Sequence, residues 1–157
     1  MARTVQDWLE AYGESHRHPV NKRIHWICVP LIVLSLIGLL WSIPVPEPLQ
    51  AMAAPFNWAS LFLLAAVLYY LLLSPALALG MLLFSILLLV VTWGLDQLPV
   101  PLWALALAIF VLAWIGQFIG HRIEGRSPSF FQDLQFLMIG PLWLLAHLYR
   151  ALGIRYG

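Results

Sequence analysis

The chain has 157 residues, of which 62% are hydrophobic and only 10% charged, and its mean hydropathy is +0.89. Soluble domains carry roughly 25% charged residues, so this chain cannot cover itself with polar surface and is expected to form one membrane-embedded domain, residues 1–157. The net charge of +1 gives no support for a nucleic-acid partner, and the single cysteine, Cys28, excludes an internal disulfide framework.

The N-terminal segment precedes the first apolar stretch. Residues 1–23 contain no apolar run long enough for a cleavable signal, and their acidic residues are mixed among basic ones. Val5, Leu9 and Tyr12, with Trp8, fall on one face of a helix. The sequence therefore predicts a short surface helix before the first membrane span.

Several apolar segments follow, and a helix that crosses a bilayer needs about 20 apolar residues. Four segments approach this length, at residues 24–43, 56–73, 77–95 and 102–123. The second and third are separated only by Ser-Pro-Ala at residues 74–76, which predicts an antiparallel helical hairpin.

A fifth apolar stretch, residues 134–149, is of marginal length for a membrane span. Gly140 and Pro141 interrupt it, which favours a re-entrant or interfacial segment. The expected fold is an all-α integral membrane bundle of four to five transmembrane helices.

The basic residues indicate the orientation of the chain. They gather before the first span and after the fourth, at Arg3, Arg17, Lys22, Arg23, Arg122 and Arg126. Because cytoplasmic loops are enriched in lysine and arginine, both regions are expected to face the cytoplasm. A fifth full crossing would place Arg150 and Arg155 outside, which favours a final segment that does not cross. The leucine- and alanine-rich composition, with no retrieval signal, favours a bacterial inner membrane, or the endoplasmic reticulum in a eukaryote.

One polar cluster lies just before the first span, in the sequence YGESHRHPVNKRIHW at residues 12–26. It contains His16, His18 and His25, three of the five histidines. Asn21 and His25 are four residues apart and therefore share a helix face.

A second polar cluster lies at the end of the fourth span. Gln117, His121 and Glu124 follow the spacing of four and then three residues that aligns side chains on one helix face. The orientation places both clusters at the cytoplasmic ends of their spans. If the first and fourth spans are neighbours, His16, His25 and His121 converge.

Gly116 and Gly120 would let another helix approach the fourth span closely, because small residues four apart favour close helix packing.

Converging imidazoles are typical ligands of iron, zinc and copper. Glu124 is either a ligand or an acceptor that fixes a histidine tautomer, and Gln117 is placed to orient a substrate or a bound water. Gln117, Glu124 and Asn21 are thus the candidate catalytic residues. His147 joins the cluster only if the fifth stretch returns to the cytoplasmic face.

Other interpretations stay open at this point. Histidines near span ends also extend to the membrane interface without binding anything, and His18 is expected to be solvated. Glu124 could instead pair with Arg122, Arg126 or a base near Lys22.

The two clusters together resemble the 2-hydroxy fatty acid dioxygenase family, small membrane proteins that act in fatty acid α-oxidation. The shared pattern is a histidine followed by Pro19, Asn21 and His25, and later Gly-His-x-x-Glu-Gly-x-x-Pro, residues 120–128. This resemblance implies Fe²⁺ as the cofactor, with His16, His25 and His121 as its ligands. Many members carry a glutamate where this chain has His147, so ligation by His147 would change the charge of the site.

The resemblance also implies the reaction, in which a 2-hydroxy fatty acid and O2 give a fatty acid one carbon shorter, carbon dioxide and water. Arg122, Arg126, Arg23 or Lys22 would hold the substrate carboxylate, and the acyl tail would extend along the apolar spans among membrane lipid.

Two rival interpretations belong to other classes of protein. In the first, His25 and His121 are the axial ligands of a b-type haem in an electron carrier. In the second, the chain is a transporter or scaffold without chemistry. A bundle of this size could also form a homo-oligomer.

Overall fold

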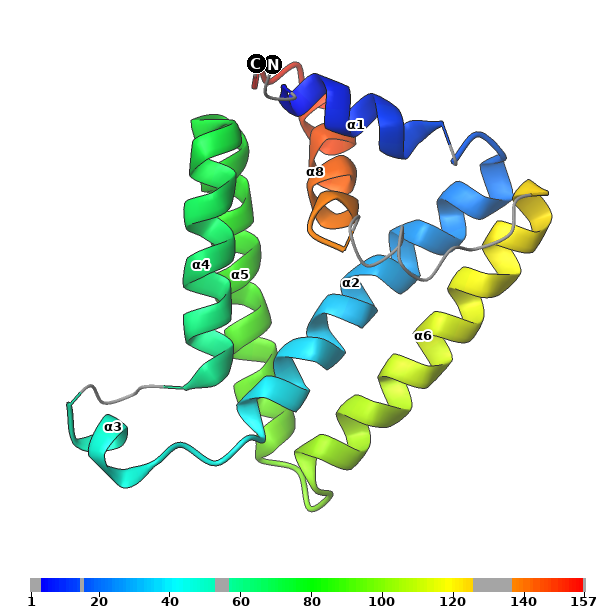
Figure 1. Ribbon diagram of the computed structural model, residues 1–157. Coiled ribbons are helices and arrows are strands. Elements are labelled where there is room, and N and C mark those ends of the chain that lie inside the picture. Colours follow the sequence, from blue (N-terminus) through cyan, green and yellow to red (C-terminus); the bar gives the residue numbers. More distant parts are fainter. Residues whose placement is uncertain (1–3, 15, 53–56, 126–136, 157) are drawn as a thin grey trace.

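The computed structural model describes residues 4–14, 16–52, 57–125 and 137–156, and every regular element in these ranges is a helix, as expected for an all-α protein (Figure 1). The elements are α1 (Val5–Gly13), α2 (Pro19–Trp41), α3 (Glu47–Met52), α4 (Trp58–Leu73), α5 (Pro75–Asp96), α6 (Leu102–Glu124) and α8 (Ile139–Ala151). The short helix α3 forms in the proline-rich connection after the first span.

Three of the described helices, α2, α5 and α6, are long and apolar enough to cross a membrane. The predicted second span corresponds to α4, which has 16 residues because it begins only after its N-cap Asn57. At 1.5 Å per residue, α4 covers about 24 Å, less than the roughly 30 Å of a hydrocarbon core. Three of the four expected spans are therefore long helices, and the fourth, α4, is a shorter apolar helix.

Helices α2 and α6 lie side by side, so that the beginning of α2 meets the end of α6 (Figure 1). The two predicted small residues of α6 make this contact possible. A methyl group at Gly116 would lie 2.6 Å from Cys28 Sγ, and one at Gly120 would overlap Asn21 Oδ1. The prediction that Gly116 and Gly120 admit a neighbouring helix is confirmed, and that helix is α2.

Helices α4 and α5 form the predicted antiparallel hairpin, and Ser74 separates them (Figure 1). The Ser74 side chain accepts from the backbone N–H of Leu77, and Pro75 occupies the first helical position, where its missing N–H costs little. Ser74 Oγ also donates to the carbonyl of Tyr156 at 2.5 Å. This bond attaches the C-terminal segment to the hairpin.

Helix α1 is the short N-terminal helix that the sequence predicts, but its apolar face packs against protein. Thr4 and Asp7 form a capping box at its start. Its buried residues Val5, Leu9 and Tyr12 belong to one core cluster with residues of α8. Helix α8 therefore covers the stripe that was expected to lie on the membrane surface.

Helix α8 begins just before the Gly-Pro pair that was expected to interrupt the fifth stretch. Gly140 and Pro141 lie in its first turn and do not interrupt it. The reason is that the first-turn N–H groups of a helix have no intrahelical acceptor, so proline is tolerated there. At 13 residues, α8 covers about 20 Å, too short for a membrane crossing. Residues 134–136 of the predicted fifth stretch lie outside the described ranges.

Candidate metal centre

Three histidines from distant parts of the sequence meet in the structure. His16 precedes α2, His25 lies in α2 and His121 lies near the end of α6. Their ring centroids are 4.1 Å apart for His16 and His25, 5.2 Å for His25 and His121, and 5.6 Å for His16 and His121. The side chains are only 4%, 2% and 6% exposed in that order. The predicted convergence of these imidazoles, called the triad below, is confirmed.

Backbone carbonyl groups determine the tautomers of two triad members. His16 Nδ1 lies 2.6 Å from the Tyr12 carbonyl oxygen, and His25 Nδ1 lies 3.0 Å from that of Asn21. Because a carbonyl oxygen only accepts, each Nδ1 carries a hydrogen and donates it. In a neutral imidazole, Nε2 then presents a lone pair. The Nε2 atoms of His16 and His25 face each other at 2.8 Å.

Two facing lone pairs repel each other, so the arrangement requires a cation between them or a proton on one ring. Burial lowers the pKa of His16 from 6.5 to about 4, because a charged imidazolium is disfavoured away from water. His16 is therefore neutral at pH 7. In the triad, one suitable atom from each residue lies within 4.8 Å of the others. Three imidazoles this close together would form a donor set typical of divalent transition metals.

Aromatic rings hold His16 in place. The Tyr12 ring stacks on the His16 ring at a centroid distance of 4.2 Å and an interplanar angle of 9°. The Trp143 ring lies 5.6 Å from the same imidazole. Because α1 and α8 supply these rings, the packing of α1 on α8 orients a potential ligand that belongs to no helix.

Glu124 connects the end of α6 to the beginning of α2. Its Oε1 accepts from the backbone N–H of Arg17 at 2.8 Å, and its Oε2 accepts from the N–H of His18 at 2.9 Å and from Asn21 Nδ2 at 3.0 Å. These N–H groups, rather than a basic side chain, are its partners in the described part of the chain. A carboxylate is also favoured at the positive end of the α2 dipole. Glu124 thus anchors the segment that carries His16.

We expect Glu124→Gln to weaken metal binding about 10- to 100-fold, the usual cost of removing a group that supports a ligand. The new amide would point an NH2 group at N–H donors, so the segment around His16 would lose an anchor. Titration of the metal-free protein against a competing chelator measures this affinity. Glu47→Gln, far along the chain in α3, is the matched control. An unchanged affinity in the Glu124 variant would show that this anchor is dispensable.

The two other candidate catalytic residues occupy different positions. Asn21 is completely buried, and its side chain contacts Glu124 and Gly120 of α6. Its backbone carbonyl accepts from His25 Nδ1 within α2. Gln117 lies one turn before His121 and is 7% exposed. Its Oε1 is buried without a hydrogen-bond partner among the described residues.

Two cavities border the triad. The first, called the apolar cavity, includes His25, His121 and Gln117 in its wall. Most of its remaining lining is apolar, with Tyr12, Val29, Ile32, Val33, Trp114, Leu137 and Gly140. Gln117 therefore lies in the cavity wall beside two potential metal ligands.

The second cavity, called the polar basin, has His16 in its wall. Its polar lining includes Glu10, His16, Arg17, Lys22, His147 and Arg150. The indole of Trp143 also lines it and lies 4.0 Å from the His147 ring.

His147 lies in this basin and outside the triad. Its Nδ1 is 3.0 Å from the Trp143 carbonyl oxygen and 3.1 Å from Arg150 Nη2. The structure therefore brings His147 to the same end of the molecule as the triad, as expected if the final segment does not cross the membrane. His147 is not among the three histidines whose nitrogens lie close together.

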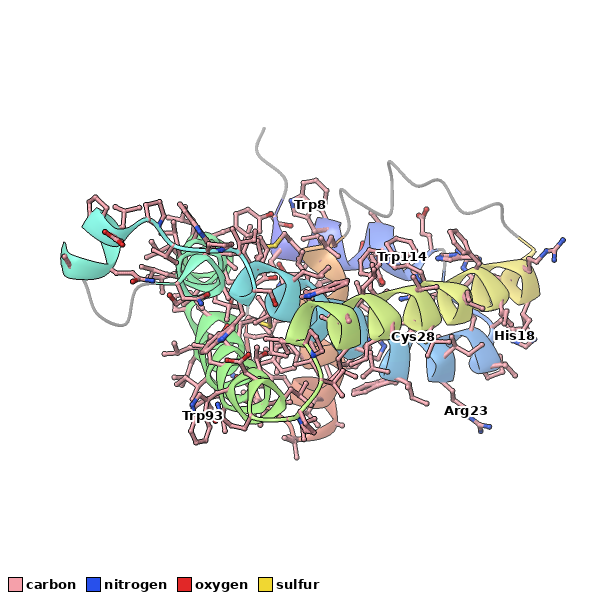
Figure 2. The ribbon with its side chains drawn as sticks, turned by 90° about the horizontal axis from the view of Figure 1, so that it is seen from below. Trp8, His18, Arg23, Cys28, Trp93 and Trp114 are labelled. Atoms are coloured by element: carbon pink, nitrogen blue, oxygen red, sulfur yellow. The ribbon has the colours of Figure 1, made fainter. Side chains whose placement is uncertain are left out.

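The predicted carboxylate-binding arginines are not brought to the triad. Arg23 and Arg122 are exposed and line neither cavity, and Figure 2 shows Arg23 pointing away from the helices. Arg126 lies outside the described residues. His18 is exposed and accepts from the N–H of Val20, so it caps α2. The sequence interpretation missed Arg150. Its spacing of three residues from His147 places both on one helix face, but only the packing of α8 brings them to the basin.

Similarity to known proteins assigns the chain to a family. The family model described as "2-hydroxy-palmitic acid dioxygenase Mpo1-like" matches residues 2–152. The chain is 30% identical over 152 residues to a Saccharomyces cerevisiae protein named 2-hydroxy-palmitic acid dioxygenase MPO1, and the match covers 95% of this chain and 82% of the yeast protein. No solved structure matches the chain. The family match covers both polar clusters and almost the whole sequence, and the chain therefore belongs to the Mpo1-like family.

Proposed function

We propose that this protein is an iron(II)-dependent dioxygenase that shortens 2-hydroxy fatty acids by one carbon. The observation that carries the proposal is the pair of Nε2 lone pairs of His16 and His25 facing each other at 2.8 Å, with His121 beside them. Neutral, buried imidazoles in this arrangement are suited to a divalent transition metal. Family membership supports the substrate class and the use of O2. Iron is preferred over zinc because zinc has no redox chemistry with which to reduce O2.

The reaction balances without another reductant. R–CHOH–COOH and O2 give R–COOH, CO2 and H2O, and the organic substrate supplies all four electrons that O2 accepts. Bound iron(II) would supply redox chemistry and open coordination positions for this step. The role of the protein residues is then to hold the hydroxyl-bearing carbon beside the triad.

The two cavities fit an amphiphilic substrate. Val29, Ile32 and Val33 give the apolar cavity a lining that suits an acyl tail. Gln117 lies in the same wall as His25 and His121, where its amide oxygen can accept a hydrogen bond from the 2-hydroxyl group. By the distribution of basic residues, we place the triad at the cytoplasmic face of the membrane.

The triad argues against the haem alternative. A porphyrin occupies four coordination positions in one plane and leaves only two for histidines, whereas three imidazoles meet here. In addition, a methyl group at Gly120 would already overlap Asn21, so α2 and α6 leave no space for a porphyrin between them at this level. A transporter or scaffold without chemistry gives no reason for two Nε2 lone pairs to face each other.

Replacing Gln117 by leucine should lower turnover about 2- to 10-fold, the effect of losing one neutral hydrogen bond, while iron content stays unchanged. Leucine retains most of the side-chain volume, so the cavity shape is conserved. Steady-state rates with 2-hydroxypalmitate, together with metal analysis, measure both quantities. Phe118→Leu, on the exposed face of the same helix, is the control. Equal rates in the Gln117 variant and the wild type would remove Gln117 from the site.

Reconstitution tests the proposed function itself. The protein is purified without oxygen, stripped of metal, loaded with iron(II) or zinc, and then given 2-hydroxypalmitate and O2. We expect the iron-loaded protein to form pentadecanoate and one CO2 per O2 consumed, and the zinc-loaded protein to form neither. Iron-loaded protein that leaves 2-hydroxypalmitate intact would reject the proposal.

A further inference from the structure

The polar basin and the apolar cavity contact the triad through different histidines. His25 and His121 line the apolar cavity, whereas His16 lines the basin. The Trp143 ring links the basin to the triad, because its centroid lies 5.6 Å from the His16 ring and 4.0 Å from the His147 ring. A molecule at the triad thus has an apolar space on one side and a polar space on the other.

The charged groups of the basin favour an anion. Arg17, Lys22 and Arg150 line it, and Glu10 is the acidic residue in the described lining. Arg150 is held in position on α8, because its Nε donates to the Ala146 carbonyl oxygen at 3.3 Å. A guanidinium group held in this way is well suited to bind a carboxylate through two hydrogen bonds.

We propose that the polar basin binds the substrate carboxylate, with Arg150 as the main binding residue and Lys22 and Arg17 supporting it. This inference rests on the proposed function and defines its substrate class as free acids rather than esters or thioesters. The polarity of the two cavities determines the direction of binding. The tail is excluded from the charged basin, and the apolar cavity offers a carboxylate no cationic side chain in its described lining.

Binding to the metal-free protein tests the proposal independently of oxidation. We expect Arg150→Gln to weaken palmitate binding roughly 10- to 100-fold, as expected for loss of a charge-assisted hydrogen bond, and to leave hexadecanol binding unchanged. Arg150→Lys should give an intermediate palmitate affinity, since it retains the charge but not the planar donor pair. Arg155→Gln is the matched control because Arg155 is exposed and lines neither cavity.

Two results would overturn the inference. Unchanged palmitate affinity in Arg150→Gln would exclude the basin as the carboxylate site, and an equal loss for palmitate and hexadecanol would show that the variant acts on the tail or on the fold. Neither iron nor O2 is present in this binding experiment. If palmitate binding depends on Arg150 but the iron-loaded protein forms no pentadecanoate, the proposed oxidation is rejected and the basin remains the carboxylate site. If Arg150→Gln forms product as fast as the wild type, the oxidation is supported and the basin is rejected as the carboxylate site.

Discussion

His121→Ala should purify without iron and should leave 2-hydroxypalmitate unchanged, the largest effect expected of any single substitution in this chain. His121 supplies one of three buried imidazoles, and α6 provides no other nitrogen of this kind in the triad. Metal sites with four ligands bind with about 10–16 kcal/mol, so one ligand accounts for several kcal/mol, more than about a hundredfold in affinity. Metal analysis after anaerobic loading, followed by product analysis, measures the result.

Two other histidine variants serve as controls for this experiment. His18→Asn should keep its iron, because His18 is exposed and asparagine retains an N-cap acceptor for α2. His147→Ala should also keep its iron, because His147 lies outside the triad. Full iron occupancy in His121→Ala would contradict the assignment, and loss of iron in His147→Ala would add a fourth ligand to it.

Gly120→Ala should destabilise the protein by about 1–3 kcal/mol, the usual cost of overpacking a close contact. The added methyl group would overlap Asn21 Oδ1, so α2 would have to move away from α6. Such a movement also separates His25 from His121, and metal affinity should fall together with stability. Thermal unfolding in detergent, with and without iron, measures both effects.

Gly94→Ala is the matched control for this prediction, with an effect of opposite sign. Gly94 lies in α5, and an added methyl group would meet nothing within 4 Å in the described structure. Alanine at such a position should stabilise the helix by about 0.4–1 kcal/mol. A Gly120→Ala protein as stable as the wild type would show that the contact between α2 and α6 tolerates a side chain.

The convergence of His25 and His121 could be predicted because it depends on local rules. Spacing places side chains on helix faces, basic residues place helix ends on one side of the membrane, and Gly116 with Gly120 identifies the face that admits a neighbour. None of these rules needs the tertiary structure. They therefore bring His25 and His121 together, although about 100 residues separate the two. His16 lies in no helix, and contacts with Tyr12 and Trp143 hold it in the triad.

The roles of Glu124 and Arg150 could not be predicted, because they depend on tertiary contacts. Glu124 binds backbone N–H groups, which exist at every residue and leave no signature in the sequence. The position of Arg150 follows from α8, whose first turn includes the Gly-Pro pair that the sequence suggested as an interruption. The sequence interpretation placed the carboxylate-binding arginines close to the histidine clusters. In the structure, the basin is also lined by Arg150 of α8, which is distant from both clusters in sequence.

The position of the iron tests the account most directly. Crystals of iron-loaded protein, measured at the iron absorption edge, would show each iron atom as a peak of anomalous scattering. We predict one peak per chain, about 2.1 Å from Nε2 of His16 and of His25 and from a ring nitrogen of His121. A peak elsewhere, or fully loaded crystals with no peak among these three rings, would contradict the proposed metal centre.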